Sequence, residues 1–298
     1  MNIALDSNIA SVEFNGSEVD AVEFNGTEVW RKAAPSPQIT LVWEPKTWSS
    51  APSSLDGYYI WSDGTDIYYS NRTNQYVLDK TTSTWNTKTW AANGNNIRGD
   101  AIWFDNDNVY HSSGTNQYVL DKTTSRWNTK TWNGLPSNLR LSGLQVWSDG
   151  TNIYYSYSTN QYVLDSSTST WGTKTWNGLP SDVSILGDRV WSDGTDIYFS
   201  NGSYQYVFDK STSTWNAKTW NGLSDFIGYN VWTDNSNIYC SFKDSDIQYH
   251  YILDKTTYTW TPITCTGLDN FSTTSKIWSD GTDIYYSNSL EQYVLINS

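Results

Sequence analysis

The sequence predicts an all-β protein: a six-bladed β-propeller of four-stranded blades, preceded by a short β-hairpin segment. One pattern recurs six times, its leading tryptophans are 42, 44, 44, 41 and 46 residues apart, and turn sequences divide each repeat into four short apolar runs. Periods of about 40–50 residues with four strands each are typical of propeller blades. The leading tryptophans are Trp61, Trp103, Trp147, Trp191, Trp232 and Trp278.

The first repeat illustrates the expected blade. Its predicted strands cover residues 58–62, 67–70, 75–79 and 85–90. Asp63-Gly64 favours a two-residue hairpin turn between the first two strands, and the polar segment 79–83 favours a turn between the last two. Because both turns recur almost unchanged, we expect every blade to be built in the same way.

The ends of the propeller are expected to meet in blade six. The last repeat stops at Ser298 without a tryptophan-containing fourth strand, whereas Trp43 and Trp48 near the N-terminus reproduce the spacing of Trp85 and Trp90. We therefore predict that residues 40–48 complete blade six beside residues 290–296. This closure would leave few open strand edges.

The repeat resembles the kelch repeat of β-propellers over about residues 38–298. The shared features are an apolar strand with a tight turn, then Ile-Tyr, Tyr-x-x-Asp, a polar turn and Trp. The resemblance implies a kelch-like six-bladed propeller. Kelch repeats end their second strand with Gly-Gly, whereas Ser70-Asn71, Ser156-Tyr157 and Ser287-Asn288 stand there in this chain. We expect the inner packing to differ accordingly.

The N-terminal segment contains a second, shorter duplication, residues 12–19 and 22–29. Asn15-Gly16 and Asn25-Gly26 are hairpin-turn signals, and alternation with Glu leaves one apolar face, which about 30 residues cannot bury alone. This face should dock on a partner or on another copy of the chain. We divide the chain into an adaptor (1–32), a proline-rich linker (33–37) and the propeller (38–298). The candidate anchor residues are Val12, Phe14, Val22, Phe24, Val29 and Trp30.

The duplicated Val-x-x-Val-x-Phe-Asn-Gly-x-x-Val-Trp segment resembles short N-terminal pieces of bacteriophage tail proteins and other virion-associated proteins. The resemblance covers residues 9–30 and implies attachment to other virion proteins through the hairpins. The propeller would then bind a glycan or protein on the host surface. Under this interpretation the protein is made in the host cytoplasm and located in the virion.

The net charge and the lack of long apolar runs limit the kinds of partner that we expect. The net charge of −13 disfavours binding to nucleic acid phosphates or to anionic membranes. No apolar run approaches the roughly 18 residues of a membrane helix, and the first residues lack the basic start and apolar run of a signal peptide. We expect no nucleic acid partner and no membrane insertion.

Few residues of the sequence are candidates for a catalytic or metal-binding site. Residues repeated in every blade are explained by packing and turns, and Cys240 and Cys265 suggest neither a disulfide framework nor a metal site. His111 and His250 lie three repeats apart, where the first repeat has Tyr69 and Gln75. We therefore predict a non-enzymatic protein with no cofactor and no bound metal. A glycan-cleaving propeller using Glu44, Glu291 or Asp182 remains an alternative.

The variation between repeats indicates a binding surface. The turns between strands one and two and between strands three and four are nearly constant, whereas the other two connections vary. In a blade these pairs open on opposite faces, so one face is uniform and the other varied. Loops on a rigid scaffold commonly carry binding; a purely structural decoration protein is the other alternative. The candidate ligand-binding residues are Arg98, Arg140, Tyr157, Asp182, Tyr204, Phe226, Tyr229 and Phe271.

Overall fold

The computed structural model describes residues 12–14, 17–19, 21–24, 27–31, 39–92, 96–105, 107–137, 139–234, 236–244, 247–268, 271, 276–288 and 290–296. For residues 12–31, Tyr58, Tyr229 and Asp244 the description covers the backbone alone. Contacts divide the chain into two compact units, Met1–Thr40 and Leu41–Ser298.

The N-terminal unit contains the two predicted hairpins. Strand β1 (Val12–Phe14) pairs antiparallel with β2 (Ser17–Val19), and β3 (Ala21–Phe24) pairs with β4 (Thr27–Arg31). The register places Val12 opposite Val19 and Val22 opposite Trp30. The predicted turns at Asn15-Gly16 and Asn25-Gly26 and the linker 33–37 lie outside the described residues.

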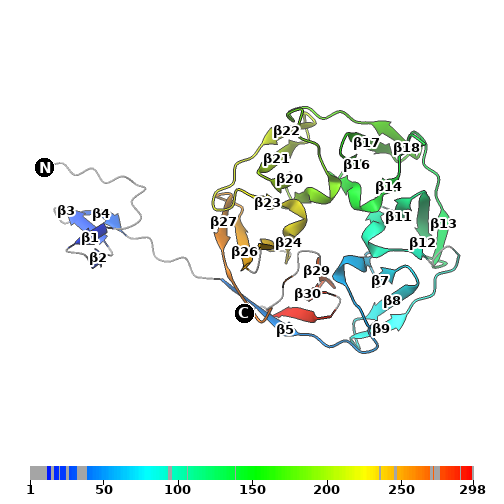
Figure 1. Cartoon of the computed structure of the whole chain (residues 1–298), viewed down its shortest axis with the longest axis horizontal. Helices are drawn as coiled ribbons and strands as arrows, with labels where there is room; N and C mark the ends of the chain where they lie inside the picture. Colours follow the sequence, from blue (N-terminus) through cyan, green and yellow to red (C-terminus); the bar gives the residue numbers. More distant parts are fainter. Residues whose placement is uncertain are drawn as a thin grey trace. The chain divides into compact units, whose positions relative to one another are not determined.

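The second unit is a six-bladed propeller, confirming the predicted fold class. Figure 1 shows the blades around a centre, with β9, β13, β18, β22 and β27 at the rim. Each blade is an antiparallel sheet, and in blades one to five the four main strands follow chain order outward. Blades one to three consist of β6 (Ile60–Ser62), β7 (Ile67–Asn71), β8 (Asn74–Asp79) and β9 (Thr84–Thr87); β10 (Ile102–Phe104), β11 (Val109–Gly114), β12 (Asn116–Asp121) and β13 (Arg126–Thr129); and β15 (Val146–Ser148), β16 (Ile153–Tyr157), β17 (Asn160–Asp165) and β18 (Thr170–Thr173).

The remaining blades repeat this order, and three short strands extend the sheets. Strand β14 (Leu141–Ser142) pairs with β11, β23 (Phe226–Ile227) with β20, and β28 (Thr264–Thr266) with β5. Blades four to six consist of β19 (Val190–Ser192), β20 (Ile197–Gly202), β21 (Tyr204–Asp209) and β22 (Thr214–Ala217); β24 (Val231–Thr233), β25 (Ile238–Asp244), β26 (Ile247–Asp254) and β27 (Thr259–Pro262); and β29 (Lys276–Ser279), β30 (Ile284–Ser287), β31 (Gln292–Ile296) and β5 (Thr40–Pro45).

The predicted closure of blade six is confirmed. Strand β5, from the N-terminal end of the propeller, pairs antiparallel with β31, and Trp43 lies opposite Leu295. The ring is thus closed by the two ends of the same chain. Cys265 lies on β28, beside β5. Both cysteines are free thiols, and Cys240 is buried.

The first connection in each blade differs from the predicted two-residue turn. Ser62 pairs with Ile67, so the connection has four residues. The Asp63 carboxylate accepts hydrogen bonds from the backbone N–H groups of Thr65 and Asp66, both at 2.9 Å. An Asp side chain that bonds its own backbone stabilises this longer turn. The carboxylate also accepts a hydrogen bond from the Tyr68 hydroxyl at 3.1 Å, which assigns Asp63 a structural role.

Tryptophan packing between neighbouring blades forms the core. Trp85, Trp127, Trp171, Trp215 and Trp260 are at most 1% exposed. One cluster combines Trp147 and Tyr154 of blade three with Phe208 and Trp215 of blade four. Since a blade is covered on both faces, its strands are apolar on both faces.

A buried hydroxyl occupies the position where kelch repeats carry glycine. Ser70 is fully buried and accepts a hydrogen bond of 2.9 Å from the Trp61 indole N–H. Equivalent bonds join the inner tryptophan to a serine of the next strand in the other blades. The expected departure from standard kelch packing is thus a Trp–Ser bond that satisfies an indole N–H.

Short 3-10 helices surround the axis. In the described part of the chain they precede the inner strands of blades one to five: η1 (Gly57–Tyr59), η3 (Gly99–Ala101), η4 (Gly143–Gln145), η5 (Gly187–Arg189) and η6 (Gly228–Asn230). Strand β6 was predicted to begin at Tyr58 but begins at Ile60, because Tyr58 and Tyr59 belong to η1. Successive helices contact one another around the axis.

Candidate binding face and axial pocket

One face of the propeller is held by repeated contacts between blades. The turns between strands one and two and between strands three and four lie on this face, which we call the uniform face. The Lys80 ammonium donates a 2.7 Å hydrogen bond to the backbone oxygen of Asp280 in the adjacent blade, and Lys122 donates one of 2.7 Å to that of Asp63. Lys255 reaches Asp193 in the same way. These repeated contacts explain why the turns are nearly identical.

The opposite, varied face presents an exposed aromatic residue on blade three. Tyr157 ends β16 and is 50% exposed. It lines a hollow of about 450 Å³ together with Arg140, Asn160 and Gln145. The predicted residues Arg140 and Tyr157 therefore share one site. A flat ring beside a guanidinium and amide groups can bind the faces and hydroxyls of a sugar or a side chain of a protein.

Blade four presents a second pair of predicted residues. Tyr204, at the start of β21, is 41% exposed, and its hydroxyl donates a 3.2 Å hydrogen bond to the Asp182 carboxylate. This bond raises the pKa of the Tyr204 hydroxyl, because the neighbouring carboxylate disfavours the phenolate. Tyr204 and Asp182 thus form a second exposed pair on the varied face.

Two residues that we predicted to bind a ligand at the surface are buried. Phe226 is only 3% exposed, because it packs against Trp191, Trp220 and Trp260 in the core. Phe271 is 5% exposed and lies against Tyr286. Both residues occur in variable loops, but their side chains point into the core. The predicted residue Tyr229 lies in η6, and its side chain is outside the description.

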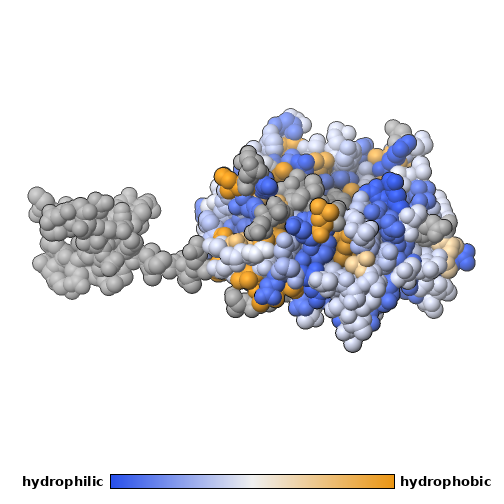
Figure 2. Space-filling view, turned by 60° about the horizontal axis from the view of Figure 1, so that its bottom comes forward, coloured by the Kyte–Doolittle hydropathy of each residue, from blue (hydrophilic) through white to orange (hydrophobic). Residues whose placement is uncertain are grey.

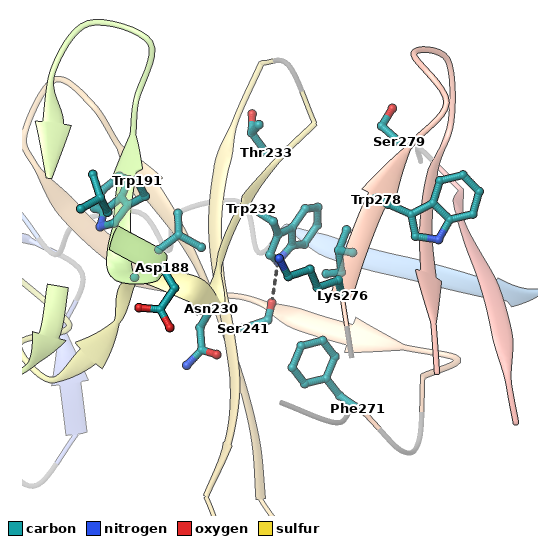
Figure 3. A pocket seen from close by; sticks show the side chains of 14 residues that line it. Asp188, Trp191, Asn230, Trp232, Thr233, Ser241, Phe271, Lys276, Trp278 and Ser279 are labelled. Atoms are coloured by element: carbon teal, nitrogen blue, oxygen red, sulfur yellow. Dashed lines mark hydrogen bonds between the residues drawn. The ribbon is translucent and has the colours of Figure 1, made fainter. Parts of the chain in front are cut away.

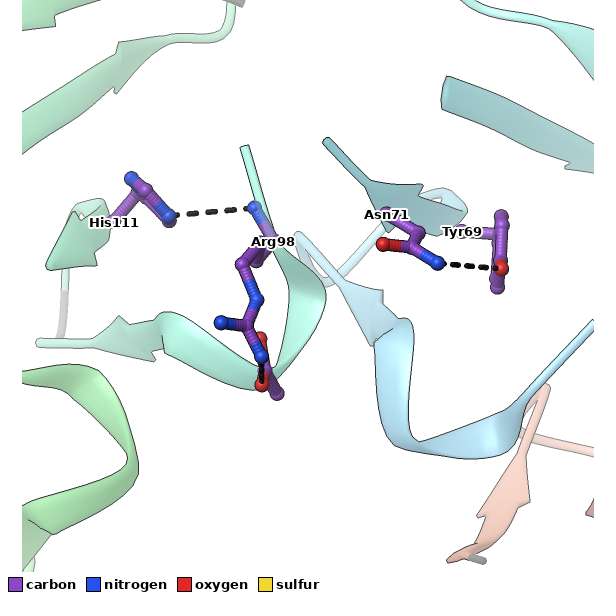
Figure 4. A network of polar contacts seen from close by, with 5 residues as sticks. Tyr69, Asn71, Arg98 and His111 are labelled. Atoms are coloured by element: carbon purple, nitrogen blue, oxygen red, sulfur yellow. Dashed lines mark hydrogen bonds and ion pairs between the residues drawn. The ribbon is translucent and has the colours of Figure 1, made fainter. Parts of the chain in front are cut away.

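Arg98 is engaged near the axis. Its guanidinium pairs with Asp100, and Figure 4 shows its backbone N–H directed to His111. The guanidinium carbon also lies 5.7 Å from the centre of the Tyr59 ring. Arg98 therefore contacts residues near the axis and does not line the hollow that Arg140 and Tyr157 share.

The two histidines lie in different blades and have different partners. His111 Nε2 accepts a 3.3 Å hydrogen bond from the Arg98 backbone N–H, and His250 Nδ1 lies 3.0 Å from the Ser241 hydroxyl. Burial lowers the pKa of His111 to about 4, with a further contribution from the Arg98 charge, and burial lowers the pKa of His250 to about 4. Both imidazoles are therefore neutral in the folded protein at neutral pH.

We expect these histidines to destabilise the fold in mild acid. As pH falls from about 6.5 towards about 4, both histidines become protonated in the unfolded chain but stay neutral in the folded chain. The free energy of unfolding therefore drops by roughly 3 kcal/mol per histidine. Above pH 6.5 this loss is absent. Urea unfolding of the protein and of a His111→Tyr/His250→Gln variant, which carries the residues of the first repeat, measures the effect. An equal loss of stability in both proteins would contradict the assignment.

The visible propeller surface lacks one dominant apolar patch. Figure 2 shows hydrophobic residues in scattered groups among hydrophilic ones. Within the described residues, no helix is long and apolar enough to cross a membrane.

A pocket on the axis was not anticipated. It has a volume of about 490 Å³ and runs along the inner strands β19, β24 and β29. Figure 3 shows Asp188, Asn230 and Lys276 together with Phe271 and Trp232 around it. One signal was available in the sequence: the residue two positions before each inner tryptophan differs in all six repeats, within an otherwise regular segment. These residues are Tyr59, Ala101, Gln145, Arg189, Asn230 and Lys276.

The two propeller glutamates lie in blade six. Glu44 is exposed on β5, opposite Val294, and Glu291 precedes β31 and accepts a 3.3 Å hydrogen bond from Asn288. Neither lines the axial pocket. Within the described residues, no group of three or more His, Cys, Asp or Glu side chains is arranged to hold a metal ion.

Comparison with known proteins extends to the fold alone. No protein-family model and no curated protein matches the chain. Among solved structures, the chain is similar to YjhT (9% identity, TM-score 0.54, covering 84% of this chain and 97% of that one). It is also similar to two structures of the extracellular domain of BT4673 from B. thetaiotaomicron, each at 13% identity. Their TM-scores are 0.50 and 0.49, they cover 86% and 80% of this chain, and this chain spans 40% and 32% of their lengths. The similarity to YjhT supports the propeller fold.

Proposed function

We propose that the chain is a non-enzymatic display protein of a virion, in which the N-terminal hairpins attach to a tail or other virion protein and the propeller binds a host-surface glycan or protein. The observation that carries this proposal is the difference between the two faces. The uniform face is fixed by Lys–backbone hydrogen bonds, whereas the varied face exposes Tyr157 and Tyr204. Loops that differ on an otherwise regular scaffold are suited to recognition.

The chemistry of the varied face supports a polar ligand. Arg140 and Tyr157 line one hollow, and Tyr204, at the start of a strand of the next blade, is hydrogen bonded to Asp182. Aromatic rings combined with guanidinium and carboxylate groups suit the apolar faces and hydroxyls of glycans and the polar surfaces of proteins. The assignment to a virion depends on the resemblance of residues 9–30 to the N-terminal pieces of tail proteins.

We expect a Tyr157→Ala/Tyr204→Ala variant to lose binding. Exposed aromatic anchors commonly contribute more than 1 kcal/mol each, so the dissociation constant should rise about tenfold or more. The measurement is binding of the full chain to envelope fractions from a panel of bacteria and to arrayed glycans.

Phe104→Ser is the matched control. Phe104 is 43% exposed and ends β10 on the uniform face, where the other repeats carry Ser or Thr. Loss of binding in the Phe104 variant with retention in the double tyrosine variant would reverse the assignment of faces. Absence of binding with normal particle attachment would favour a purely structural decoration protein.

The adaptor part of the proposal has its own test. Deletion of residues 1–32 should abolish incorporation into particles, because it removes both hairpins, while leaving β5 and the propeller complete. Particle incorporation of the full and shortened chains is measured by immunoblotting purified particles. Normal incorporation of the shortened chain would contradict the adaptor role.

A further inference from the structure

Asp188 and Lys276 line the axial pocket, and Asp100 of η3 interacts electrostatically with Lys276. Asp100 of blade two and Asp188 of blade four lie within electrostatic reach of Lys276 of blade six. Burial lowers the pKa of Lys276, and the two carboxylates oppose this shift by favouring the ammonium form. Burial raises the pKa of both Asp100 and Asp188, and neighbouring cations oppose that shift. The axis therefore holds opposite charges close together in partly desolvated surroundings.

Lys276 is surrounded by protein but remains open to solvent. Its side chain is exposed to solvent. Many protein atoms nevertheless surround it, and this burial lowers its pKa. Such a combination is expected for a side chain that projects into a solvent-filled hollow. The pocket of about 490 Å³ that Lys276 lines is this hollow, and it is comparable with the pockets of about 300–1,000 Å³ that hold small ligands.

Several acceptors near the axis lack donors. Asp100 is 5% exposed and Gln145 is 9% exposed. Within the described part of the chain, Oδ1 of Asp100, Oε1 of Gln145 and Oδ1 of Asp188 are buried and receive no hydrogen bond. A buried acceptor without a donor costs about 1–3 kcal/mol. Of these residues, Asp188 lines the axial pocket, so a hydrogen-bond donor on a molecule bound there would satisfy its unpaired Oδ1 atom.

The remaining lining defines the class of that molecule. Asn230 and Lys276 offer donors beside the Asp188 acceptor, and the half-buried Trp232 supplies aromatic surface. Hydroxyl groups both donate and accept hydrogen bonds, so a polyol can satisfy both sets of groups, while its C–H face contacts the Trp232 ring. The two carboxylates disfavour an anionic ligand through repulsion.

We propose that the axial pocket binds one neutral, hexose-sized sugar residue. Asp188 would accept hydrogen bonds from its hydroxyls, Asn230 and Lys276 would donate to its oxygens, and the Trp232 ring would contact its apolar face. This inference rests on the proposed glycan-binding function and deepens it, since it gives the ligand a second site besides the tyrosines of the varied face.

Calorimetric titration of the full chain tests the proposal, with neutral hexoses and N-acetylhexosamines as probes and glucuronic acid as the anionic comparison. We expect saturable binding of at least one neutral sugar. Asp188→Asn should weaken this binding about tenfold or more, because it keeps the shape and removes the charged acceptor. Lys276→Met is the second variant, and thermal unfolding confirms that each variant is folded. The Tyr157→Ala/Tyr204→Ala variant should retain monosaccharide binding.

Three outcomes would overturn the inference: no saturable binding of any neutral sugar, unchanged binding in the folded Asp188 and Lys276 variants, or tighter binding of glucuronic acid. The two proposals fail differently. If envelope binding survives in Asp188→Asn and is lost in the double tyrosine variant, the axial site is wrong and the display function stands. Loss of envelope binding by neither variant would reject the display function itself.

Discussion

Trp43→Ala should lower the free energy of unfolding by about 4 kcal/mol, as expected for removal of a buried tryptophan. Trp43 lies on the closing strand β5 and is 2% exposed. Its ring packs between blades five and six, with ring centres 6.1 Å from Trp232 and 6.5 Å from Tyr286. The loss would therefore measure how strongly the N-terminal strand holds the ring closed.

The adjacent residue provides the control for this prediction. Glu44 is exposed on the same strand, so Glu44→Ala should change the free energy of unfolding by less than about 0.5 kcal/mol. Urea unfolding, followed by tryptophan fluorescence and by far-ultraviolet circular dichroism, measures both variants. Equal, small effects of the two substitutions would show that β5 does not close the propeller in solution.

Gly187→Ala should be nearly as damaging, at about 3 kcal/mol or more, because it overpacks a site bounded by backbone. A Cβ atom on Gly187 would lie 2.1 Å from the carbonyl oxygen of Gln145 in the preceding 3-10 helix. Gly99 and Gly143 face the preceding helix in the same way, through Tyr59 and Ala101. Alanine would force neighbouring blades apart at the axis, where no flexible side chain can yield.

Gly172→Ala is the matched control for the axial glycine. Gly172 lies on β18, and a Cβ atom there would have no neighbour within 4 Å. Alanine at this strand position should be neutral or stabilising by up to about 0.5–1 kcal/mol. Thermal and urea unfolding of the two variants provide the comparison. A Gly187 variant as stable as the Gly172 variant would exclude tight contact between successive 3-10 helices.

Much of the fold could be predicted from the sequence because the same strand and turn pattern occurs six times. The spacing of the inner tryptophans predicted the blades, and the spacing of Trp43 and Trp48 predicted the closing strand. The 3-10 helices were missed because Gly57-Tyr58-Tyr59 reads locally as the start of an apolar strand. Contact between successive blades, which involves residues about 44 apart, selects the helical turn there.

The binding site was predicted less well, for a physical reason. Variable loops identify a face, but they do not tell which side chains turn inward. Tyr157 and Tyr204 are exposed, whereas Phe226 and Phe271 fill the core beneath their own loops. The axial pocket is assembled from Asp188, Asn230 and Lys276 of three blades, so its geometry is absent from any single repeat.

The most direct test of the central claim is footprinting of the full chain by hydroxyl-radical labelling, with and without bound bacterial envelope fractions. We expect protection of Tyr157 and Tyr204 on the varied face and unchanged labelling of Phe104 on the uniform face, since all three side chains are exposed in the free protein. Protection of Phe104 with unchanged labelling of both tyrosines would contradict the assignment of recognition to the varied face.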